Sequence, residues 1–321
     1  MNNNTEEFLH KLSPCIERGD LDACVEEAAR LAEEMGVAAE DLLELSAEKG
    51  MDEKHDLVYV LALTAAQGLK NNKKAEAYIY AGFSADIIGK LREAEKYYKK
   101  AIEIDPNNAG VHNNYSNLLR EKGLLADAEK EIRNSLQIAE EDSSWQQIRP
   151  YAHGNLGDIL ADEGSLVEAE KEYQSALKNS ASMEPYLISK LHNNLGWVYV
   201  QLKQYSKAKN DFKKAVAFDP LNVKATRNLR KLDKLDDERD ISSSQKLLGF
   251  ILLLPLIASY FLFWNNRLTE TAFTVQIIFF IASLIFILLF NQIERFKAGT
   301  VEFEMNTEHG FAAKSQPGFE R

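Results

Sequence analysis

The sequence has little cysteine and a deficit of basic residues. Of 321 residues only two are cysteine, and 38 lysines and arginines stand against 49 aspartates and glutamates, a formal net charge of −11. Two cysteines are too few for a disulfide framework, and no CxxC metal spacing occurs. We therefore expect Cys15 and Cys24 to be small core residues of a protein in a reducing compartment. The acidic balance argues against a general nucleic-acid binder, which needs a basic surface.

Motifs for catalysis and for secretion are also missing. The sequence contains no phosphate-binding GxxxxGK[ST], no GxGxxG and no HExxH. Residues 1–7 include neither a basic region nor an apolar run, so we expect no signal peptide. The sequence therefore predicts a protein that is not an enzyme and that needs no cofactor or metal.

Four copies of one pattern occupy residues 75–222. Each copy predicts two amphipathic helices, A and B, because apolar residues recur at helical spacing. A small residue in helix A lets the two helices approach closely, and an alanine in helix B is followed one turn later by a large apolar residue. In chain order these positions are Gly82, Ala94 and Tyr98; Ser116, Ala128 and Ile132; Gly157, Ala169 and Tyr173; and Gly196, Ala208 and Phe212. Pro106 and Pro220 mark the end of helix B, since proline cannot continue a helix.

These residues resemble the tetratricopeptide repeat (TPR). The resemblance implies an all-α fold, a right-handed superhelical solenoid of helix-turn-helix repeats. The four units span residues 75–108, 109–149, 150–188 and 189–222, so they begin 34, 41 and 39 residues apart. The extra residues follow helix B, in 140–145 and 179–185, and the lengthened spacing resembles that of TPR arrays that bind extended peptides.

Both flanks of the repeats are predicted to be helical. We interpret residues 1–74 as a degenerate TPR-like N-terminal cap of one or two units, because terminal repeats are often atypical. Residues 223–240 resemble the C-terminal capping helix of TPR domains. The side chains predicted to cover the last unit are Val223, Leu229, Leu232 and Leu235. Residues 241–246 form a polar linker.

Two uncharged apolar runs, residues 247–264 and 272–290, predict a membrane anchor. They contain 18 and 19 residues, and at about 1.5 Å per residue each approaches the roughly 30 Å of a bilayer's hydrocarbon core. The connection, residues 265–271, is too short for any arrangement of the two runs except an antiparallel two-span hairpin. The alternative is a buried apolar hairpin of a soluble protein.

Lysines and arginines predict that both ends of the chain face the cytoplasm. Arg227, Arg230, Lys231, Lys234, Arg239 and Lys246 precede the first run, Arg295 and Lys297 follow the second, and only Arg267 lies between. We therefore expect a multi-pass membrane protein with two spans in the lipid bilayer. In the short cytoplasmic tail, residues 291–321, Val301, Phe303 and Met305 alternate with polar residues, which is a strand pattern that needs a partner.

Three histidines occupy one position in successive units. His112, His153 and His192 suggest a metal site or a proton relay at first sight. Stacked helices lie about 8–10 Å apart, however, so equivalent side chains cannot share one ion at ligand distances near 2 Å. We expect a structural role, in a position that TPR families usually fill with an aromatic residue.

Asparagines give the stronger functional indication. Asn114, Asn155 and Asn194 each follow one of these histidines by two residues, and Asn113, Asn117 and Asn193 accompany them. The resemblance places helix A on the concave surface, where exposed amides would form a ladder that bonds the backbone of an extended peptide. The alternative is that these asparagines cap or bridge neighbouring helices.

The carboxylate clamp of TPR co-chaperones, which binds acidic C-terminal tails, offers a tighter comparison. Asn117, Asn155 and Lys190 match three of its five positions. The other two positions are normally basic but are Asn113 and Asn194 here. Without these two positive charges, most of the charge-assisted hydrogen bonding of such a site is absent. A chaperone-tail receptor is therefore disfavoured. The predicted peptide-groove residues are Asn113, Asn114, Asn117, Asn155, Lys190, Asn193 and Asn194.

Together these patterns predict a membrane-anchored TPR scaffold. Its cytoplasmic solenoid would recruit a protein or peptide partner, and its C-terminal hairpin would hold that partner at the bilayer. The alternative is a subunit or assembly factor of a larger membrane complex, whose spans pack against other subunits. A transporter is disfavoured, because neither apolar run carries an ionisable residue.

Overall fold

The computed structural model describes residues 3–234 and, further along, residues 257–258, 261–265, 269, 271–275, 277–278, 281–282 and 285. Within these residues the secondary structure is helical throughout. The α-helices are α1 (Asn3–Arg18), α2 (Leu21–Met35), α3 (Ala39–Met51), α4 (His55–Gly68), α5 (Asn71–Ile87), α6 (Leu91–Ile104), α7 (Ala109–Glu121), α8 (Leu125–Glu141), α9 (Arg149–Asp162), α10 (Leu166–Lys178), α11 (Pro185–Gln201) and α12 (Tyr205–Phe218). Short 3-10 helices, η1 (Ser143–Ile148) and η2 (Ser180–Ser182), follow α8 and α10, and residues 223–234 form a further helix.

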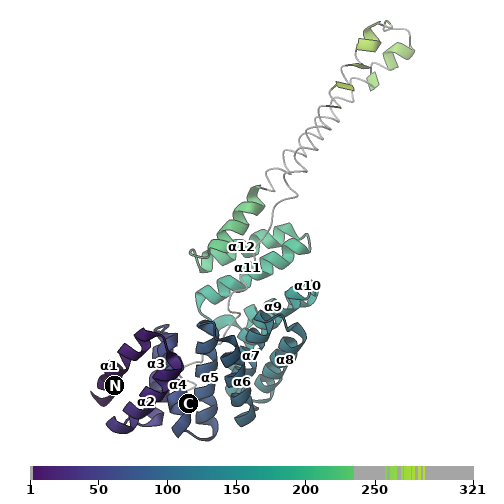
Figure 1. Cartoon of the computed structure of the whole chain (residues 1–321). Coiled ribbons are helices and arrows are strands. Elements are labelled where there is room, and N and C mark those ends of the chain that lie inside the picture. Colours follow the sequence, from purple (N-terminus) through teal and green to yellow (C-terminus); the bar gives the residue numbers. More distant parts are fainter. Residues whose placement is uncertain are drawn as a thin grey trace.

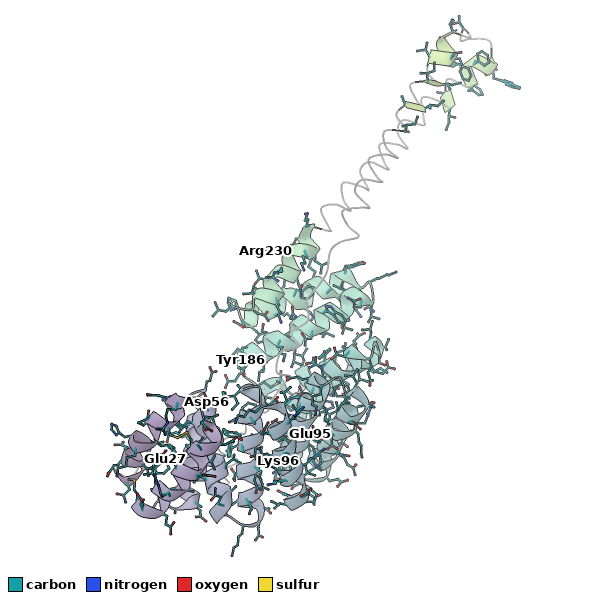
Figure 2. The ribbon with its side chains drawn as sticks, in the orientation of Figure 1. Glu27, Asp56, Glu95, Lys96, Tyr186 and Arg230 are labelled. Atoms are coloured by element: carbon teal, nitrogen blue, oxygen red, sulfur yellow. A yellow bond between two sulfur atoms is a disulfide. The ribbon has the colours of Figure 1, made fainter. Side chains whose placement is uncertain are left out.

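Successive helices form pairs that stack side by side into a solenoid (Figure 1). The turn inside a pair requires a left-handed backbone, which glycine adopts without a steric cost. Gly89, Gly123 and Gly164 occupy this position with φ values of 78°, 75° and 82°. The turn between α11 and α12 has Lys203 there instead, at φ 60°. Charged side chains such as Asp56, Lys96 and Arg230 lie on the outside of the stack (Figure 2).

The predicted close approach of the two helices in each unit is confirmed. A Cβ atom at Gly82 would lie 2.9 Å from the ring of Tyr98, and one at Gly157 would lie 2.8 Å from the ring of Tyr173. Gly196 approaches Phe212 in the same way, at 2.7 Å. These aromatic rings are fully buried. Glycine is therefore needed in helix A because the ring of helix B occupies the space that a side chain would fill.

Each of the lengthened segments between units contains a short 3-10 helix. Helix α8 continues to Glu141 and is followed by η1, while α10 ends at Lys178 and is followed by η2. Helix α11 begins at Pro185, four residues before the start expected at Ser189, because a proline is favoured in the first turn, where its missing N–H is not needed. Helix α5 likewise begins earlier than expected, at Asn71.

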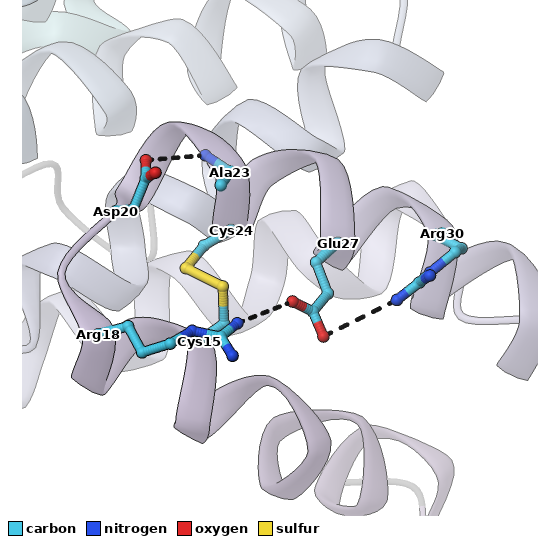
Figure 3. The surroundings of a disulfide bond; sticks show 7 residues. All are labelled: Cys15, Arg18, Asp20, Ala23, Cys24, Glu27 and Arg30. Carbon is cyan, nitrogen blue, oxygen red and sulfur yellow. Dashed lines mark hydrogen bonds and ion pairs between the residues drawn. A yellow bond between two sulfur atoms is a disulfide. The ribbon is translucent and has the colours of Figure 1, made fainter.

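The first four helices confirm the helical prediction for residues 1–74, but the prediction for the cysteines is wrong in one respect. Cys15 and Cys24 are buried, as expected, yet they form a disulfide with a Cα–Cα distance of 5.6 Å (Figure 3). The turn around Gly19 folds α2 back on α1, and this brings the two cysteines together from nine residues apart. An ion pair between Arg18 and Glu27, at 3.2 Å, links the same two helices. The cysteine content therefore gives no support to a reducing compartment.

The helix after Pro220 covers the end of the solenoid, with a face that agrees only in part with the one expected. Asn222 caps it, because its Oδ1 accepts a hydrogen bond from the backbone N–H of Ala225 at 3.0 Å. Its buried residues are Ala225, Asn228 and Leu232. Val223, predicted to pack against the last unit, is 65% exposed. Leu232 is buried and Leu229 packs against the core, both as predicted, while Leu235 lies outside the described residues.

The predicted membrane hairpin lies mostly outside the described residues. The described parts of 257–285 include helical residues with outward-facing apolar side chains, among them Phe261 and Trp264. The rings of Phe263 and Phe273, one from each apolar run, stack at a centroid distance of 4.5 Å. Among the described residues, no helix combines the length and the apolar character needed to cross a bilayer.

Candidate functional site

The predicted groove residues lie on α7, α9 and α11, the first helices of their pairs. Local signals start each helix: Asn108 Oδ1 accepts from the backbone N–H of Val111 at 3.2 Å, and Pro150 and Pro185 open the other two. Helix α7 carries Asn113, Asn114 and Asn117; α9 carries Asn155; α11 carries Lys190, Asn193 and Asn194. All seven side chains are buried, with at most 8% of their surface exposed.

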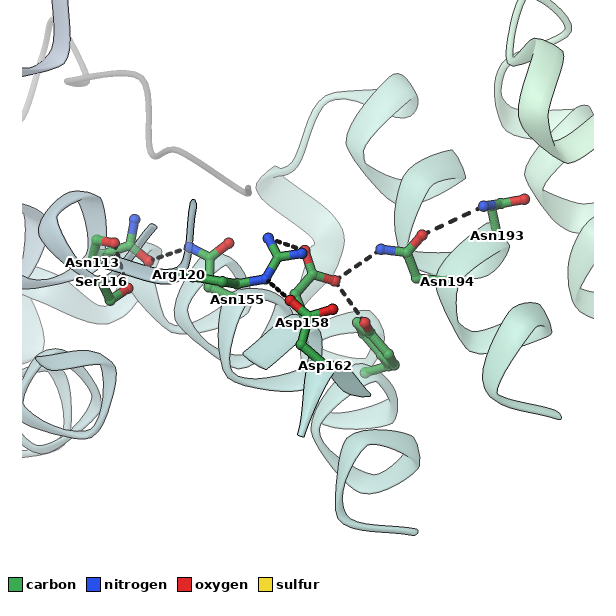
Figure 4. A network of polar contacts seen from close by, with 9 residues as sticks. Asn113, Ser116, Arg120, Asn155, Asp158, Asp162, Asn193 and Asn194 are labelled. Carbon is green, nitrogen blue, oxygen red and sulfur yellow. Dashed lines mark hydrogen bonds and ion pairs between the residues drawn. The ribbon is translucent and has the colours of Figure 1, made fainter. Parts of the chain in front are cut away.

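Most of these asparagines are linked by hydrogen bonds in two groups, one on α7 and α9 and one that begins on α11 (Figure 4). We call Asn113, Asn114, Asn155, Asn193, Asn194 and Asn228 the amide row. Asn113 Nδ2 donates to Asn114 Oδ1 at 3.1 Å, and Asn113 Oδ1 accepts from Asn155 Nδ2 at 2.8 Å. Further along, Asn193 Oδ1 accepts from Asn228 Nδ2 at 3.0 Å. The row therefore connects α7 to α9, and α11 to the helix at residues 223–234.

The expectation that these amides are exposed is wrong. They bridge neighbouring helices, which is the alternative left open by the sequence. The physical reason is that an amide in a small-residue seam between stacked helices is buried, and a buried amide needs partners. Binding of a ligand by these asparagines stays a prediction.

A buried ionic cluster interrupts the amide row between α9 and α11. Asp158 Oδ1 accepts from Asn194 Nδ2 at 2.8 Å and from the hydroxyl of Tyr173 at 2.6 Å. Arg120 of α7 lies across from it, with Nη1 3.6 Å from Asp158 Oδ2 and Nε 2.6 Å from Asp162 Oδ2. The cluster thus joins α7, α9, α10 and α11.

Burial and charge act against each other in this cluster. Burial favours the neutral form of Arg120, but Asp158 and Asp162 outweigh it and hold the guanidinium pKa above its ordinary value. For Asp162 the balance is reversed, because burial raises its carboxyl pKa more than Arg120 lowers it. Burial, together with Asp158, raises the pKa of Tyr173 well above its usual range. The guanidinium therefore stays charged and bound to its carboxylates.

Two of the predicted groove residues stand apart from the row. Asn117 is 3% exposed, and neither its Nδ2 nor its Oδ1 has a hydrogen-bond partner. Lys190 is 8% exposed, and burial lowers the pKa of its ammonium group to about 8. Of the two normally basic positions of the carboxylate clamp, Asn113 makes hydrogen bonds within the row and Asn194 donates a hydrogen bond to Asp158.

The ionic cluster was not predicted from the sequence. Asp158 occupies in its unit the position that Asn117 occupies in the preceding unit. The sequence therefore showed that polar residues recur at this position. The partner, Arg120, lies 38 residues away on another unit and has no equivalent in the following units, where Ala161 and Val200 take its place. A search for repeated residues therefore overlooked it.

The histidines have the structural role that was predicted. The Nδ1 atom of each donates a hydrogen bond to a carboxylate on the second helix of its own unit. The distances are 2.6 Å from His112 to Glu131, 2.7 Å from His153 to Glu172 and 2.8 Å from His192 to Asp211. Each pair therefore ties helix A to helix B. In the described part of the chain, no three metal-ligating side chains gather in one place.

Comparison with known proteins identifies the repeat. Family profiles described as tetratricopeptide repeat match residues 75–108, 97–130 and 149–220. Residues 75–130 and 149–220 therefore match tetratricopeptide repeats. No curated protein sequence matches the chain.

Solved structures support the TPR solenoid fold. The crystal structure of the APC/C hetero-tetramer Cut9–Hcn1 is similar to 65% of this chain, at 16% identity and a TM-score of 0.56; the match spans 40% of that protein. The structure of PilF from Pseudomonas aeruginosa is similar to 67% of this chain, at 17% identity and a TM-score of 0.51; the match spans 91% of PilF. At these identities the likeness concerns the fold alone.

Proposed function

We propose that this protein is a membrane-anchored TPR scaffold, which binds an extended segment of a partner protein along α7, α9 and α11. The observation that carries the proposal is Asn117, whose buried amide has neither a donor partner nor an acceptor partner. Leaving a buried polar atom unsatisfied costs roughly 1–3 kcal/mol. A peptide backbone carries both N–H and C=O groups, and it would satisfy both atoms once the Asn117 side chain, 3% exposed here, turns toward it on binding.

The anchor is the second part of the proposal. Residues 247–264 and 272–290 would span the bilayer as a hairpin, with both termini in the cytoplasm. The stacked rings of Phe263 and Phe273 support an antiparallel arrangement of the two runs. Exposed apolar side chains on the described helical residues, such as Ile257, Trp264 and Ile278, support an apolar environment around them.

A pair of substitutions tests the binding role. Asn117→Ala removes an amide that bonds nothing in the fold, so we expect the melting temperature to stay unchanged or rise, while partner capture from solubilised membranes falls about tenfold. Asn155→Ala is the matched control within the row. It leaves Asn113 Oδ1 without the donor at 2.8 Å, so we expect a loss of roughly 1–3 kcal/mol of stability.

The outcomes separate binding from structure. If Asn117→Ala captures the same proteins in the same amounts as the wild type, the groove proposal fails. Deletion of residues 247–290 tests the anchor: the protein should leave the membrane fraction. A stable stoichiometric complex in mild detergent that depends on 247–290, and not on Asn117, would favour the subunit or assembly-factor alternative.

A further inference from the structure

A cavity of about 600 Å³ lies between α10, α11 and α12, away from the amide row. Helix α11 contributes Ile188, His192, Leu195 and Tyr199 to it, at the spacing of a single helix face. Lys190 follows Ile188 by two residues, and Asn194 follows His192 by two residues. At about 100° per residue, two residues are about 200° apart around the helix axis. The cavity therefore opens on the side of α11 opposite the amide row.

The floor of this cavity is apolar and aromatic. Leu177 of α10, Leu195 and Tyr199 of α11, and Phe218 at the end of α12 line it. The ring of Phe218 stacks on His192 at a centroid distance of 5.7 Å, yet Phe218 remains 46% exposed. The volume falls within the range of about 300–1,000 Å³ typical of ligand pockets.

The rim of the cavity is positively charged, in a protein whose net charge is −11. Lys178, Lys207 and Lys214 line it, against a single carboxylate, Asp211, which is bound by His192 Nδ1 at 2.8 Å. Lys207 lies over the Tyr199 ring and 3.8 Å from Glu170. Within residues 3–234, Lys178 and Lys214 make no ion pair and no side-chain hydrogen bond. We call this site the lysine-rimmed pocket.

We propose that the lysine-rimmed pocket binds an acidic peptide segment of a partner protein, through one large apolar side chain of that segment. The apolar floor provides the burial that anchors a phenylalanine, leucine or tryptophan side chain. The lysines on the rim attract acidic residues on either side of the anchor, which sets specificity and the rate of encounter. The chain would thereby hold two protein segments at once, one on each side of α11.

The probes are fluorescein-labelled heptapeptides with a central phenylalanine, leucine or tryptophan between glutamates and aspartates. Their binding to the purified full-length chain in mild detergent is followed by fluorescence anisotropy. We expect at least one to bind. A twin with a central alanine, and a twin with lysines in place of the acidic residues, should each bind about tenfold more weakly or not at all. The proposal is overturned if none of the acidic peptides binds, or if the twins bind equally well.

Variants locate the site. Lys178→Glu with Lys214→Glu should weaken the acidic peptide at least about tenfold and strengthen the lysine-flanked twin. The matched control is Lys171→Glu with Lys213→Glu, which makes the same charge change on exposed positions of the same two helices, outside the pocket. Equal losses in the two double variants would show general electrostatics only and overturn the proposal.

A further variant fills the cavity without touching the buried core. Asn210 is exposed and lines the pocket, so Asn210→Trp should block the anchor side chain and lower the affinity for the acidic peptide. Circular dichroism checks that each variant keeps its helical content. Binding that survives Asn210→Trp in a folded protein would place the peptide elsewhere. Because these residues lie apart from Asn117, the test is independent of the proposed groove.

Discussion

The substitution Gly157→Ala tests how the units are held together. The new Cβ would lie 2.8 Å from two ring carbons of Tyr173 and 3.1 Å from a third. Tyr173 is fully buried, so its ring cannot swing into solvent. Its hydroxyl also donates to Asp158 at 2.6 Å, and Asp158 in turn accepts from Asn194. Any shift of the ring therefore disturbs the ionic cluster between α9 and α11.

Two opposing contributions decide the magnitude. Alanine in a helix interior is favoured over glycine by roughly 0.5–1 kcal/mol, which would stabilise the variant. Forcing an extra carbon into a packed core costs typically about 1–3 kcal/mol. Because the ring is fixed both by burial and by its hydrogen bond, we place the cost in the upper part of this range. The net result is a destabilisation of about 1–2 kcal/mol.

Thermal and urea unfolding, followed by circular dichroism, measure the effect. We expect the melting temperature to fall by a few degrees, since about 1 kcal/mol corresponds to roughly 2–4 °C for a domain of this size. The control is Gly50→Ala in α3, where no heavy atom lies within 4 Å of the new Cβ; it should be neutral or stabilising. If Gly157→Ala is as stable as Gly50→Ala, the close-approach argument is refuted.

The second unit of the chain suggests a compensating pair. There Ser116 stands opposite Ile132, so a helix-A residue with a Cβ occurs where the helix-B residue is not aromatic. Gly157→Ala combined with Tyr173→Ile should therefore be less destabilised than the sum of the two single variants. Simple additivity would indicate that the two side chains do not compete for the same space.

Other predictions concern charge, the disulfide and a turn. Burial, with the nearby Glu121, raises the pKa of Asp86 to about 7. A raised carboxyl pKa contributes stability that is complete below about pH 4 and is lost as the pH rises through 7. Asp86→Asn should therefore flatten the curve of unfolding free energy against pH between about pH 4 and 7. Reduction of the Cys15–Cys24 disulfide, which joins residues nine apart, should weaken α1 and α2 by up to about 3 kcal/mol, seen as faster amide exchange in these helices and not in α12. Lys203→Gly should raise stability by up to about 1 kcal/mol, measured by urea unfolding, because Lys203 has a φ of 60° where the other turns have glycine.

The parts of the fold set by short-range pattern were predicted well. Gly82, Gly157 and Gly196 were expected to face a large residue of helix B, and each lies within 3 Å, measured from an added Cβ, of the aromatic ring in its own unit. These contacts recur in three of the four units and join helices that are close in sequence. Periodicity and spacing are therefore sufficient to find them.

The partners of polar residues were not predictable in the same way. Asn155 was recognised as a member of a repeated series, but its acceptor, Asn113, lies 42 residues away on another helix. The disulfide between Cys15 and Cys24 depends on the direction in which α2 folds back at Gly19. Val223 was assigned to the buried face of its helix and is 65% exposed, whereas Ala225 and Asn228, which were not assigned to that face, are buried. Each of these depends on how one unit is placed against the next, which composition does not determine.

The amide row also limits how a peptide could bind. A ligand that bonds Asn113 or Asn155 has to replace a hydrogen bond already made within the protein, and exchanging one such bond for another gains little. Along this row, hydrogen bonds can therefore add affinity only at polar atoms that the fold leaves unsatisfied. The amide of Asn117 is such a group. Oδ2 of Asp158, at the equivalent position of the next unit, makes no hydrogen bond but lies in an ion pair 3.6 Å from Arg120 Nη1. The junction between α7 and α9, not the row as a whole, is where a bound segment would be recognised.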